Sequence, residues 1–176
     1  FLAFLLRKDK DISFSELEIS INKNFWEKLI KISSANLILP SVYFSLKSLN
    51  KYEIDIPTDL EIYLKEIYKI NSERNRLILD QMANISNVFE SNNIDYVFLK
   101  GSALIALDVN NMRNERMLGD IDILIKPCDI DNANKLLIQN GYKAKVSSEK
   151  HLTEDIYKRK HLARLTNTKF IAAVEL

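Results

Sequence analysis

Two aspartates stand two positions apart in the stretch GDIDILI, in which isoleucine fills the alternate positions. In a β-strand, residues two apart project from the same face, so Asp120 and Asp122 share one side of the predicted strand. Carboxylates ~6 to 7 Å apart on a partly buried face repel by roughly 2 to 3 kcal/mol at an effective dielectric near 20. A divalent cation between them removes that repulsion, and Mg²⁺ prefers oxygen ligands of this kind. The pair therefore predicts a metal site, unless Asp120 caps a loop and Asp122 points into water at a strand end.

A glycine and a serine precede these acids, in the stretch FLKGSAL. A predicted strand ends there, and the residues after Gly101 and Ser102 are helical in pattern. Glycine lets the backbone pass close to a ligand, and the free N–H groups at the start of a helix favour an anion. The chain has neither the Gly-Lys-Ser/Thr ending of a P-loop nor a Gly-x-Gly-x-x-Gly motif. The pair predicts a small phosphate-binding turn, with an ordinary turn as the alternative.

A third acidic residue, Glu175, lies among apolar residues in the closing stretch AAVEL. Because buried unpaired glutamate is rare, this position indicates either a third ligand for the metal site or the exposed face of an edge strand. Acidic pairs with the spacing of Asp120 and Asp122 occur five more times, so spacing alone predicts little. The order of the segments says more. A predicted strand is followed by Gly-Ser, a helix, an acidic strand and a later acidic strand. This order supplies a triphosphate-binding turn and three carboxylates.

The elements that position these residues differ before and after residue 94. Before it, apolar residues recur at steps of three and four, which indicates helices. They are Phe25, Trp26, Leu29, Ile30, Ile32, Val42, Tyr43, Leu46 and Leu49. A helix of about 30 residues is then predicted from Thr58, read as the N-cap of a capping box with Glu61. One face of this helix is a mostly apolar stripe formed by Leu60, Leu64, Ile67, Asn71, Arg74, Ile78, Met82, Ile85 and Phe89. We expect its one cation, Arg74, to reach the surface rather than to belong to a functional site.

After residue 94 the pattern alternates between strands and short helices. DYVFLK, DIDILI and YKAKV are predicted strands, SALIALDV and DIDNANKLLIQNG are predicted helices, and HLARL and KFIAAVEL flank TNTK as a hairpin. Helices that alternate with strands imply a small mixed sheet backed by helices. We therefore expect an α+β fold with a helical region at 1–93 and a core at 94–176.

Composition limits the location and the partners. The chain has 176 residues and one cysteine, which excludes an internal disulfide framework. Its net charge is +1, so no overall electrostatic field favours a nucleic-acid or membrane partner. No stretch approaches the ~20 apolar residues of a membrane span. We expect a soluble, cytoplasmic protein without a membrane partner. Because the chain lacks an initial Met and stops inside a predicted strand, we also expect it to be a piece of a longer protein.

Several motifs occur together in one order along the chain. LKG is followed by RMLGDIDILI, the stretches FWEKLIKISSANLILPSVYFSLK and NSERNRLIL precede them, and CDIDNANKLLIQNGY and the closing VEL follow. Over nearly its whole length the chain thereby resembles the uncharacterised nucleotidyltransferase family of the DNA polymerase β-like nucleotidyltransferase superfamily. The resemblance implies a small mixed β-sheet of the polymerase β palm type with an N-terminal helical region.

The resemblance also implies a reaction. Asp120, Asp122 and Glu175 would be the catalytic carboxylates and the ligands of two Mg²⁺ ions, with Mn²⁺ as the alternative metal. The implied chemistry is transfer of a nucleoside monophosphate from an NTP to an acceptor hydroxyl, with release of pyrophosphate. The acceptor, whether small molecule, RNA or protein, and the preferred base are not determined by the sequence.

The nucleotide-binding residues are implied in the same way. Gly101 and Ser102 match the positions expected at the β and γ phosphates. Arg116, four residues before Asp120, matches a basic position of the family, and Lys100 projects from the same turn as Gly101.

Other functions fit parts of the sequence. A catalytically inactive nucleotide-binding or antitoxin-like protein-interaction module would keep the fold and bind NTP without turnover, and a helical interaction protein would dock through its first 90 residues. A calcium loop at DIDNAN is disfavoured because its fifth position is Ala133 and no glycine follows. Late basic residues indicate a solvated face, or a surface for RNA or a triphosphate tail. They are Lys143, Lys145, Lys150, Lys158, Arg159, Lys160, Arg164 and Lys169.

Overall fold

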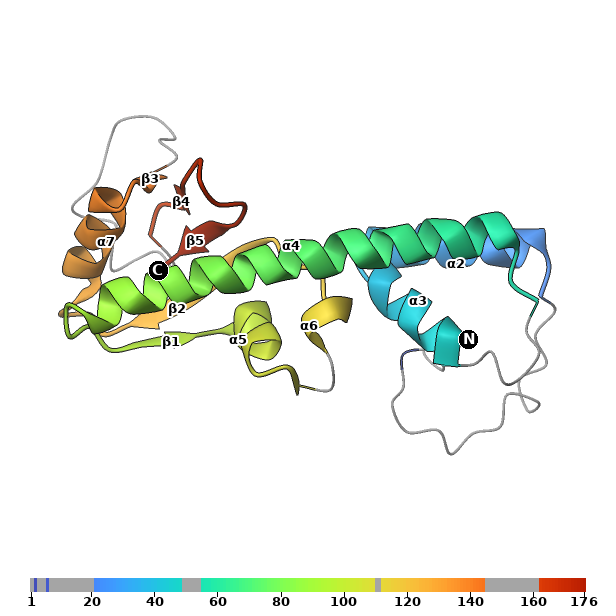
Figure 1. Cartoon of the computed structure of the whole chain (residues 1–176), viewed down its shortest axis with the longest axis horizontal. Coiled ribbons are helices and arrows are strands. Elements are labelled where there is room, and N and C mark those ends of the chain that lie inside the picture. Colours follow the sequence, from blue (N-terminus) through green and yellow to red (C-terminus); the bar gives the residue numbers. More distant parts are fainter. Residues whose placement is uncertain (1, 3–5, 7–20, 49–54, 110–111, 145–161) are drawn as a thin grey trace. The chain divides into compact units, whose positions relative to one another are not determined.

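The computed structural model describes residues 2, 6, 21–48, 55–109, 112–144 and 162–176. These residues form two compact units. Unit 1 holds the described residues up to Glu73 together with Asn114–Met117, and unit 2 holds those of Arg74–Arg113 and Leu118–Leu176. The long helix α4 (Thr58–Glu90) and the short helix α6 (Met112–Glu115) contribute residues to both units (Figure 1).

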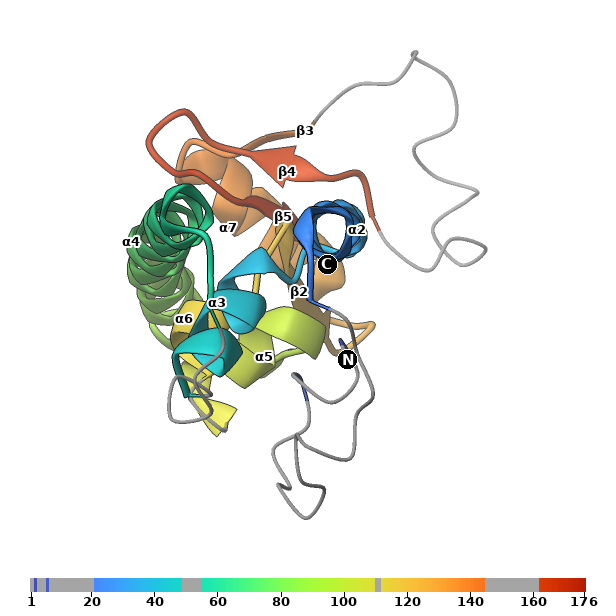
Figure 2. The same ribbon diagram turned by 90° about the vertical axis from the view of Figure 1, so that its right-hand side faces the viewer.

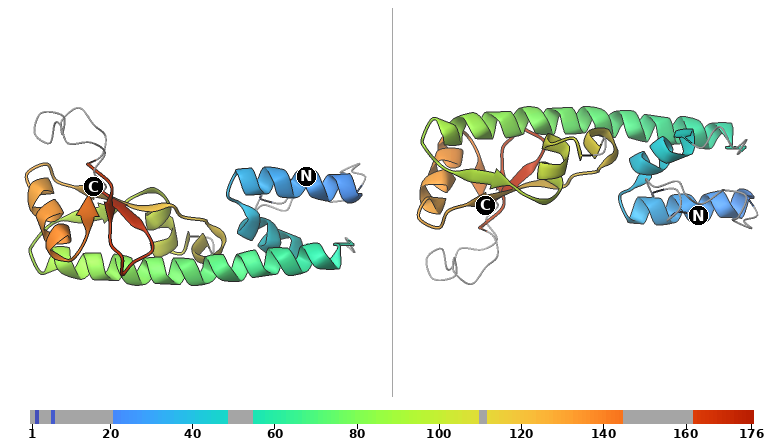
Figure 3. Two further views of the ribbon diagram at one scale, coloured as in Figure 1. Left: turned by 90° about the horizontal axis from the view of Figure 1, so that it is seen from above. Right: turned by 90° about the horizontal axis from the view of Figure 1, so that it is seen from below.

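Unit 1 is helical. Helix α2 (Lys23–Ala35) begins after Asn22, whose side-chain oxygen accepts a hydrogen bond of 3.0 Å from the Phe25 N–H. This bond satisfies one of the N–H groups that a helix start leaves free. Helix α3 (Leu39–Ser48) follows, and α2 and α3 lie beside the first part of α4 (Figure 3).

The core of unit 1 follows the predicted helical spacing closely. Its buried apolar side chains are Trp26, Leu29, Leu39, Val42, Leu46 and Leu64. Ile32 lies in α2, as the helical spacing predicted, but its side chain is exposed, while that of Ser33 is buried. The predicted Leu49 lies outside the described residues.

Helix α4 confirms the predicted long helix and its stripe, but its start differs from the expected capping box. The Glu61 N–H donates to the Pro57 carbonyl (3.0 Å), so Pro57 occupies the N-cap position and Thr58 is already helical. Proline has no side-chain acceptor, so it cannot make the capping hydrogen bond that Ser, Thr, Asp or Asn makes at an N-cap. The Leu60 N–H is satisfied by the Asp59 carboxylate at 2.9 Å.

Unit 2 contains a five-stranded mixed sheet with strand order β1-β2-β5-β4-β3. The strands are β1 (Tyr96–Phe98), β2 (Asp120–Ile125), β3 (Lys143–Ala144), β4 (Leu165–Thr166) and β5 (Ala173–Glu175). β2 and β5 are parallel, whereas the other neighbouring pairs are antiparallel, and β3, β4 and β5 form one side of the sheet (Figure 2). The predicted hairpin is therefore confirmed as β4 and β5. The end of the predicted strand YKAKV lies outside the described residues.

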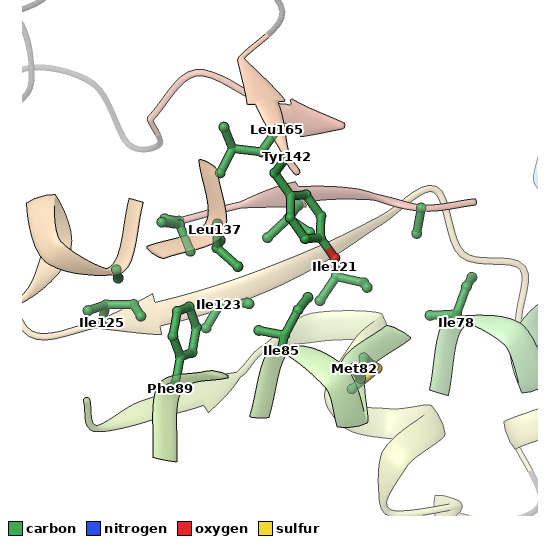
Figure 4. Close-up of a cluster of buried hydrophobic side chains, with 14 of the residues drawn as sticks. Ile78, Met82, Ile85, Phe89, Ile121, Ile123, Ile125, Leu137, Tyr142 and Leu165 are labelled. Atoms are coloured by element: carbon green, nitrogen blue, oxygen red, sulfur yellow. The ribbon is translucent and has the colours of Figure 1, made fainter. Parts of the chain in front are cut away.

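One face of this sheet is buried under helices. Ile121, Ile123 and Ile125 of β2 point toward Ile85 and Phe89 of α4 (Figure 4). Helix α7 (Ile130–Gln139) adds its buried residues to the same cluster, and α5 (Lys100–Ala106) packs against β1 and β2. Because side chains alternate along a strand, Asp120, Asp122 and Leu124 leave β2 on the opposite face, called the open face below.

The fold class predicted from the sequence is confirmed. Helices cover a small mixed sheet, and the alternation of β2 is the one that its isoleucines predicted. No helix in the described part of the chain combines the length and the apolar character that crossing a membrane requires.

Candidate active site on the open face of the sheet

Three carboxylates share the open face of unit 2. The parallel pairing of β2 and β5 sets Asp122 opposite Glu175, and Asp120 opposite Ala173. Residues directly opposite each other in paired strands project from the same face. The structure therefore brings together the three acids that the sequence predicted, from two strands that are distant in the chain.

The three carboxylates differ in exposure. The side chain of Asp122 is only 7% exposed, that of Glu175 is 22% exposed and that of Asp120 is 33% exposed. A nearly buried carboxylate requires a charged or hydrogen-bonding partner, because desolvation penalises the ionised form. Asp122 is thus the acid that depends most on its neighbours.

Two cationic side chains contact these acids. The Lys100 Nζ lies 2.7 Å from Asp122 Oδ1. Arg164 reaches the other two, with its guanidinium 2.7 Å from Asp120 Oδ2 and 3.4 Å from Glu175 Oε1. Each carboxylate of the open face therefore has a cationic partner in this structure.

Lys100 occupies an unusual backbone position. Its φ is +50°, in the left-handed region that non-glycine residues seldom adopt. The hydrogen bond with Asp122 raises the pKa of the Lys100 ammonium, and the charges of Asp122, Glu175 and Asp120 raise it further. The turn thereby directs a protonated lysine at the most buried acid, and backbone conformations of this kind concentrate at functional sites.

Ser102 and Gly101 are buried beside the same turn. The Ser102 hydroxyl lies 2.6 Å from the Leu99 carbonyl, to which it donates, and 3.3 Å from the Asp122 carbonyl. In this conformation the hydroxyl connects the start of α5 to β2 instead of facing the open side. The first intrahelical bond of α5 runs from the Ala103 N–H to the Leu99 carbonyl, so the earlier N–H groups of Gly101 and Ser102 have no intrahelical acceptor.

The two arginines singled out in the sequence have different surroundings. Arg116 is exposed and belongs to unit 1, where its carbonyl accepts a hydrogen bond of 3.1 Å from Asn71. Its expected part in phosphate binding stays a prediction. Arg74 was expected to reach the surface, and that expectation was wrong: it is half-buried, burial lowers its pKa, and it donates to the Leu118 carbonyl. Arg74 therefore binds the backbone two residues before Asp120.

Arg164 is the site residue that the sequence did not single out. It was one of eight late basic residues, most of which lie outside the described ranges. The structure places it through the hairpin, in which Leu165 pairs with Val174 and both are buried. The residue before Leu165 must then lie next to Glu175 on the open face.

The donor set suits a hard divalent cation by chemistry and by backbone placement, since three carboxylates on one face supply oxygen ligands. Among the described residues, no three Asp, Glu, His or Cys side chains converge as a ready-made ligand set. The carboxylates are instead turned onto Lys100 and Arg164. Cation binding therefore requires new rotamers for these side chains, while the paired strands that carry them can stay in place.

The chain matches the model of a known protein family. The model of the family described as uncharacterised nucleotidyltransferase matches residues 22–172, which include Lys100, Asp120 and Asp122 and end before Glu175. Searches of curated proteins and of solved structures each found no match. The match covers most of the chain, and the mixed sheet with its acidic face agrees with the fold that the resemblance implied. The chain belongs to the family of uncharacterised nucleotidyltransferases.

Proposed function

We propose that this protein transfers a nucleoside monophosphate from an NTP to an acceptor hydroxyl and releases pyrophosphate. The observation that carries the proposal is the pairing of Asp122 with Glu175 on the open face, with Asp120 two positions along the same strand. Family membership supports the general class of reaction. The single cysteine supports a reducing, cytoplasmic location.

Asp120 and Asp122 are the proposed ligands of two Mg²⁺ ions, or of Mn²⁺ in their place. When bound, such ions activate the acceptor oxygen and neutralise charge on the triphosphate. Glu175 completes the ligand set or accepts the proton of the acceptor hydroxyl. Its position beside Asp122 supports either role, because its side chain leaves the same face of the sheet.

The turn at Lys100 is the proposed phosphate-binding element. Lys100 supplies a cation that stands beside Asp122, and Gly101 and Ser102 offer backbone N–H groups. Because the Ser102 hydroxyl donates to Leu99, the proposed contact with the phosphates is made by its N–H. Arg116 is a further proposed phosphate ligand, on the resemblance alone.

The test is NTP-dependent pyrophosphate release, measured for wild type and Asp122→Asn with Mg²⁺ or Mn²⁺. Acceptors of each class are supplied: an antibiotic bearing hydroxyl groups, tRNA and a protein mixture. We expect the substitution to lower turnover by at least about 100-fold, since it removes a metal ligand. The matched control is Asp80→Asn, which alters an exposed acid on α4 that pairs with Arg76.

Equal turnover by wild type and Asp122→Asn would reject the proposal. Mg²⁺-dependent NTP binding by wild type without pyrophosphate release from any acceptor would support the inactive nucleotide-binding module instead. Thermal unfolding of each variant confirms that the proteins compared are folded.

A further inference from the structure

We propose that Arg164 is a built-in counterion of the active site, which divalent cations displace and which then binds the phosphates of the nucleotide. The inference rests on the proposed function and assigns a role to a residue outside the predicted site. Its basis is the contact of one guanidinium with two of the three carboxylates.

The sheet fixes where Arg164 stands. It comes directly before β4, and the pairing of Leu165 with Val174 places it next to Glu175 on the open face. From there it reaches across β5 to Asp120, which is possible because the residue opposite Asp120 is the small Ala173. A planar guanidinium with several N–H donors can serve both carboxylates at once, as a lysine ammonium cannot do with the same geometry.

Arg164 offsets the electrostatic repulsion among the three carboxylates. Three carboxylates on one face repel one another, and Lys100 forms its ion pair with Asp122. Without Arg164, Asp120 and Glu175 would lose the ion pairs that offset this repulsion. Arg164 supplies this compensating charge in the protein alone, so the acids stay in place before any metal binds.

The same contact competes with metal binding. A cation bound by Asp120 and Glu175 would take the carboxylate oxygens that Arg164 contacts, and two cationic groups on the same oxygens would repel each other. The guanidinium must then move away from the carboxylates. It is 44% exposed, so it has room to do so. The ligand that it suits best on the same face is a phosphate oxygen, which Arg binds through paired hydrogen bonds.

The test uses two probes with one variant. Mn²⁺ binding is measured alone by electron paramagnetic resonance, and binding of magnesium tripolyphosphate is measured by calorimetry, because this probe carries no base. Arg164→Gln should bind Mn²⁺ about tenfold more tightly and magnesium tripolyphosphate about tenfold more weakly than wild type. A purely structural role would weaken both.

Two control variants distinguish the loss of the Arg164 contacts from the loss of one positive charge. Lys169→Gln makes the same charge change at an exposed position of the β4–β5 connection, where the backbone N–H bonds Asn167. Both of its affinities should stay within about twofold of wild type. Arg164→Lys keeps the charge but loses the paired N–H donors of the guanidinium. Its Mn²⁺ affinity should therefore stay within about threefold of wild type, while it binds the tripolyphosphate more weakly. Arg164→Lys also tests the proposal if Arg164→Gln does not fold.

The outcomes distinguish this inference from the proposed function. If wild type binds Mn²⁺, Asp122→Asn does not, and Arg164→Gln binds it no more tightly, the counterion role is wrong and the metal site stands. If wild type and Asp122→Asn bind Mn²⁺ equally, or neither binds it, both proposals are overturned. Tripolyphosphate binding that Arg164→Gln leaves unchanged would overturn the phosphate role.

Discussion

Glu175 lies directly opposite Asp122 in the parallel pairing of β2 and β5, and both side chains leave the sheet on its open face. Arg164 directly precedes the next strand, β4, and contacts Glu175 and Asp120. The pairing of β2, β5 and β4 thus brings the acids of two strands beside the arginine that precedes the third. Paired strands hold these positions more firmly than loops would, because each register is fixed by hydrogen bonds and by the buried face beneath.

Glu175 provides the most direct test of this arrangement. Glu175→Gln should lower turnover by at least about 100-fold, because an amide is a poorer metal ligand than a carboxylate and cannot accept the acceptor's proton. The free energy of unfolding should change by less than about 1 kcal/mol, since the ion pair with Arg164 is partly exposed. Pyrophosphate release and urea unfolding measure the two effects. Glu66→Gln, at an exposed ion pair on α4, is the control, and full activity of Glu175→Gln would contradict the assignment.

Lys100 should give a stability difference that decreases in the alkaline range. The pKa of its ammonium is raised in the folded protein above the ordinary value near 10.5, chiefly by the hydrogen bond with Asp122. The stabilisation is therefore fully present below the unfolded-state pKa and is lost as the pH rises through the folded-state pKa. Thermal unfolding of wild type and Lys100→Met should differ by a constant amount from neutral pH up to about pH 10, and by less above it.

The matched control for Lys100 is Lys65→Met, which removes an exposed lysine of α4. Its Tm should stay close to that of wild type over the whole range. A Lys100→Met difference that grows at alkaline pH would show that the ammonium does not stabilise the folded state.

Ser102 should matter for stability more than for nucleotide affinity. Its hydroxyl is fully buried and donates to the Leu99 carbonyl, so Ser102→Ala should lower the free energy of unfolding by about 1 kcal/mol. The KM for NTP should stay within about threefold, because the substitution keeps the backbone N–H. Urea unfolding and steady-state kinetics measure these effects, with exposed Ser91→Ala as the control. A KM raised tenfold or more would show that the hydroxyl itself binds the phosphates.

Gln81 of α4 should contribute strongly to stability, because it bonds the backbone of Ala172 directly before β5. Its side chain is fully buried, accepts from the Ala172 N–H at 3.1 Å and donates to the Ala172 carbonyl at 2.9 Å. Gln81→Leu leaves both groups of a buried peptide without partners and should cost about 2 to 4 kcal/mol in urea unfolding. Tyr142→Phe removes only the hydroxyl that accepts from Gln81 at 3.1 Å, and should cost about 1 kcal/mol. Equal costs for the two variants would contradict this ranking.

The sequence by itself determined the local geometry of the site and the class of fold. Alternation along β2 set Asp120 and Asp122 on one face and three isoleucines on the other, because the side-chain period of a strand is a local property. The stripe along α4 was equally readable, since helical periodicity depends only on near neighbours. The motifs around these elements also pointed to the family that the comparison found.

The tertiary structure decided which distant groups meet these acids. Strand pairing over long separations is set by packing and register, which no local pattern encodes, so Glu175 could be predicted as a candidate but not as the partner of Asp122. Arg164 could not be told apart from the other late basic residues until β4 was placed beside β5. Arg74 was misread for the same reason, because its acceptor, the Leu118 carbonyl, comes from a segment far along the chain.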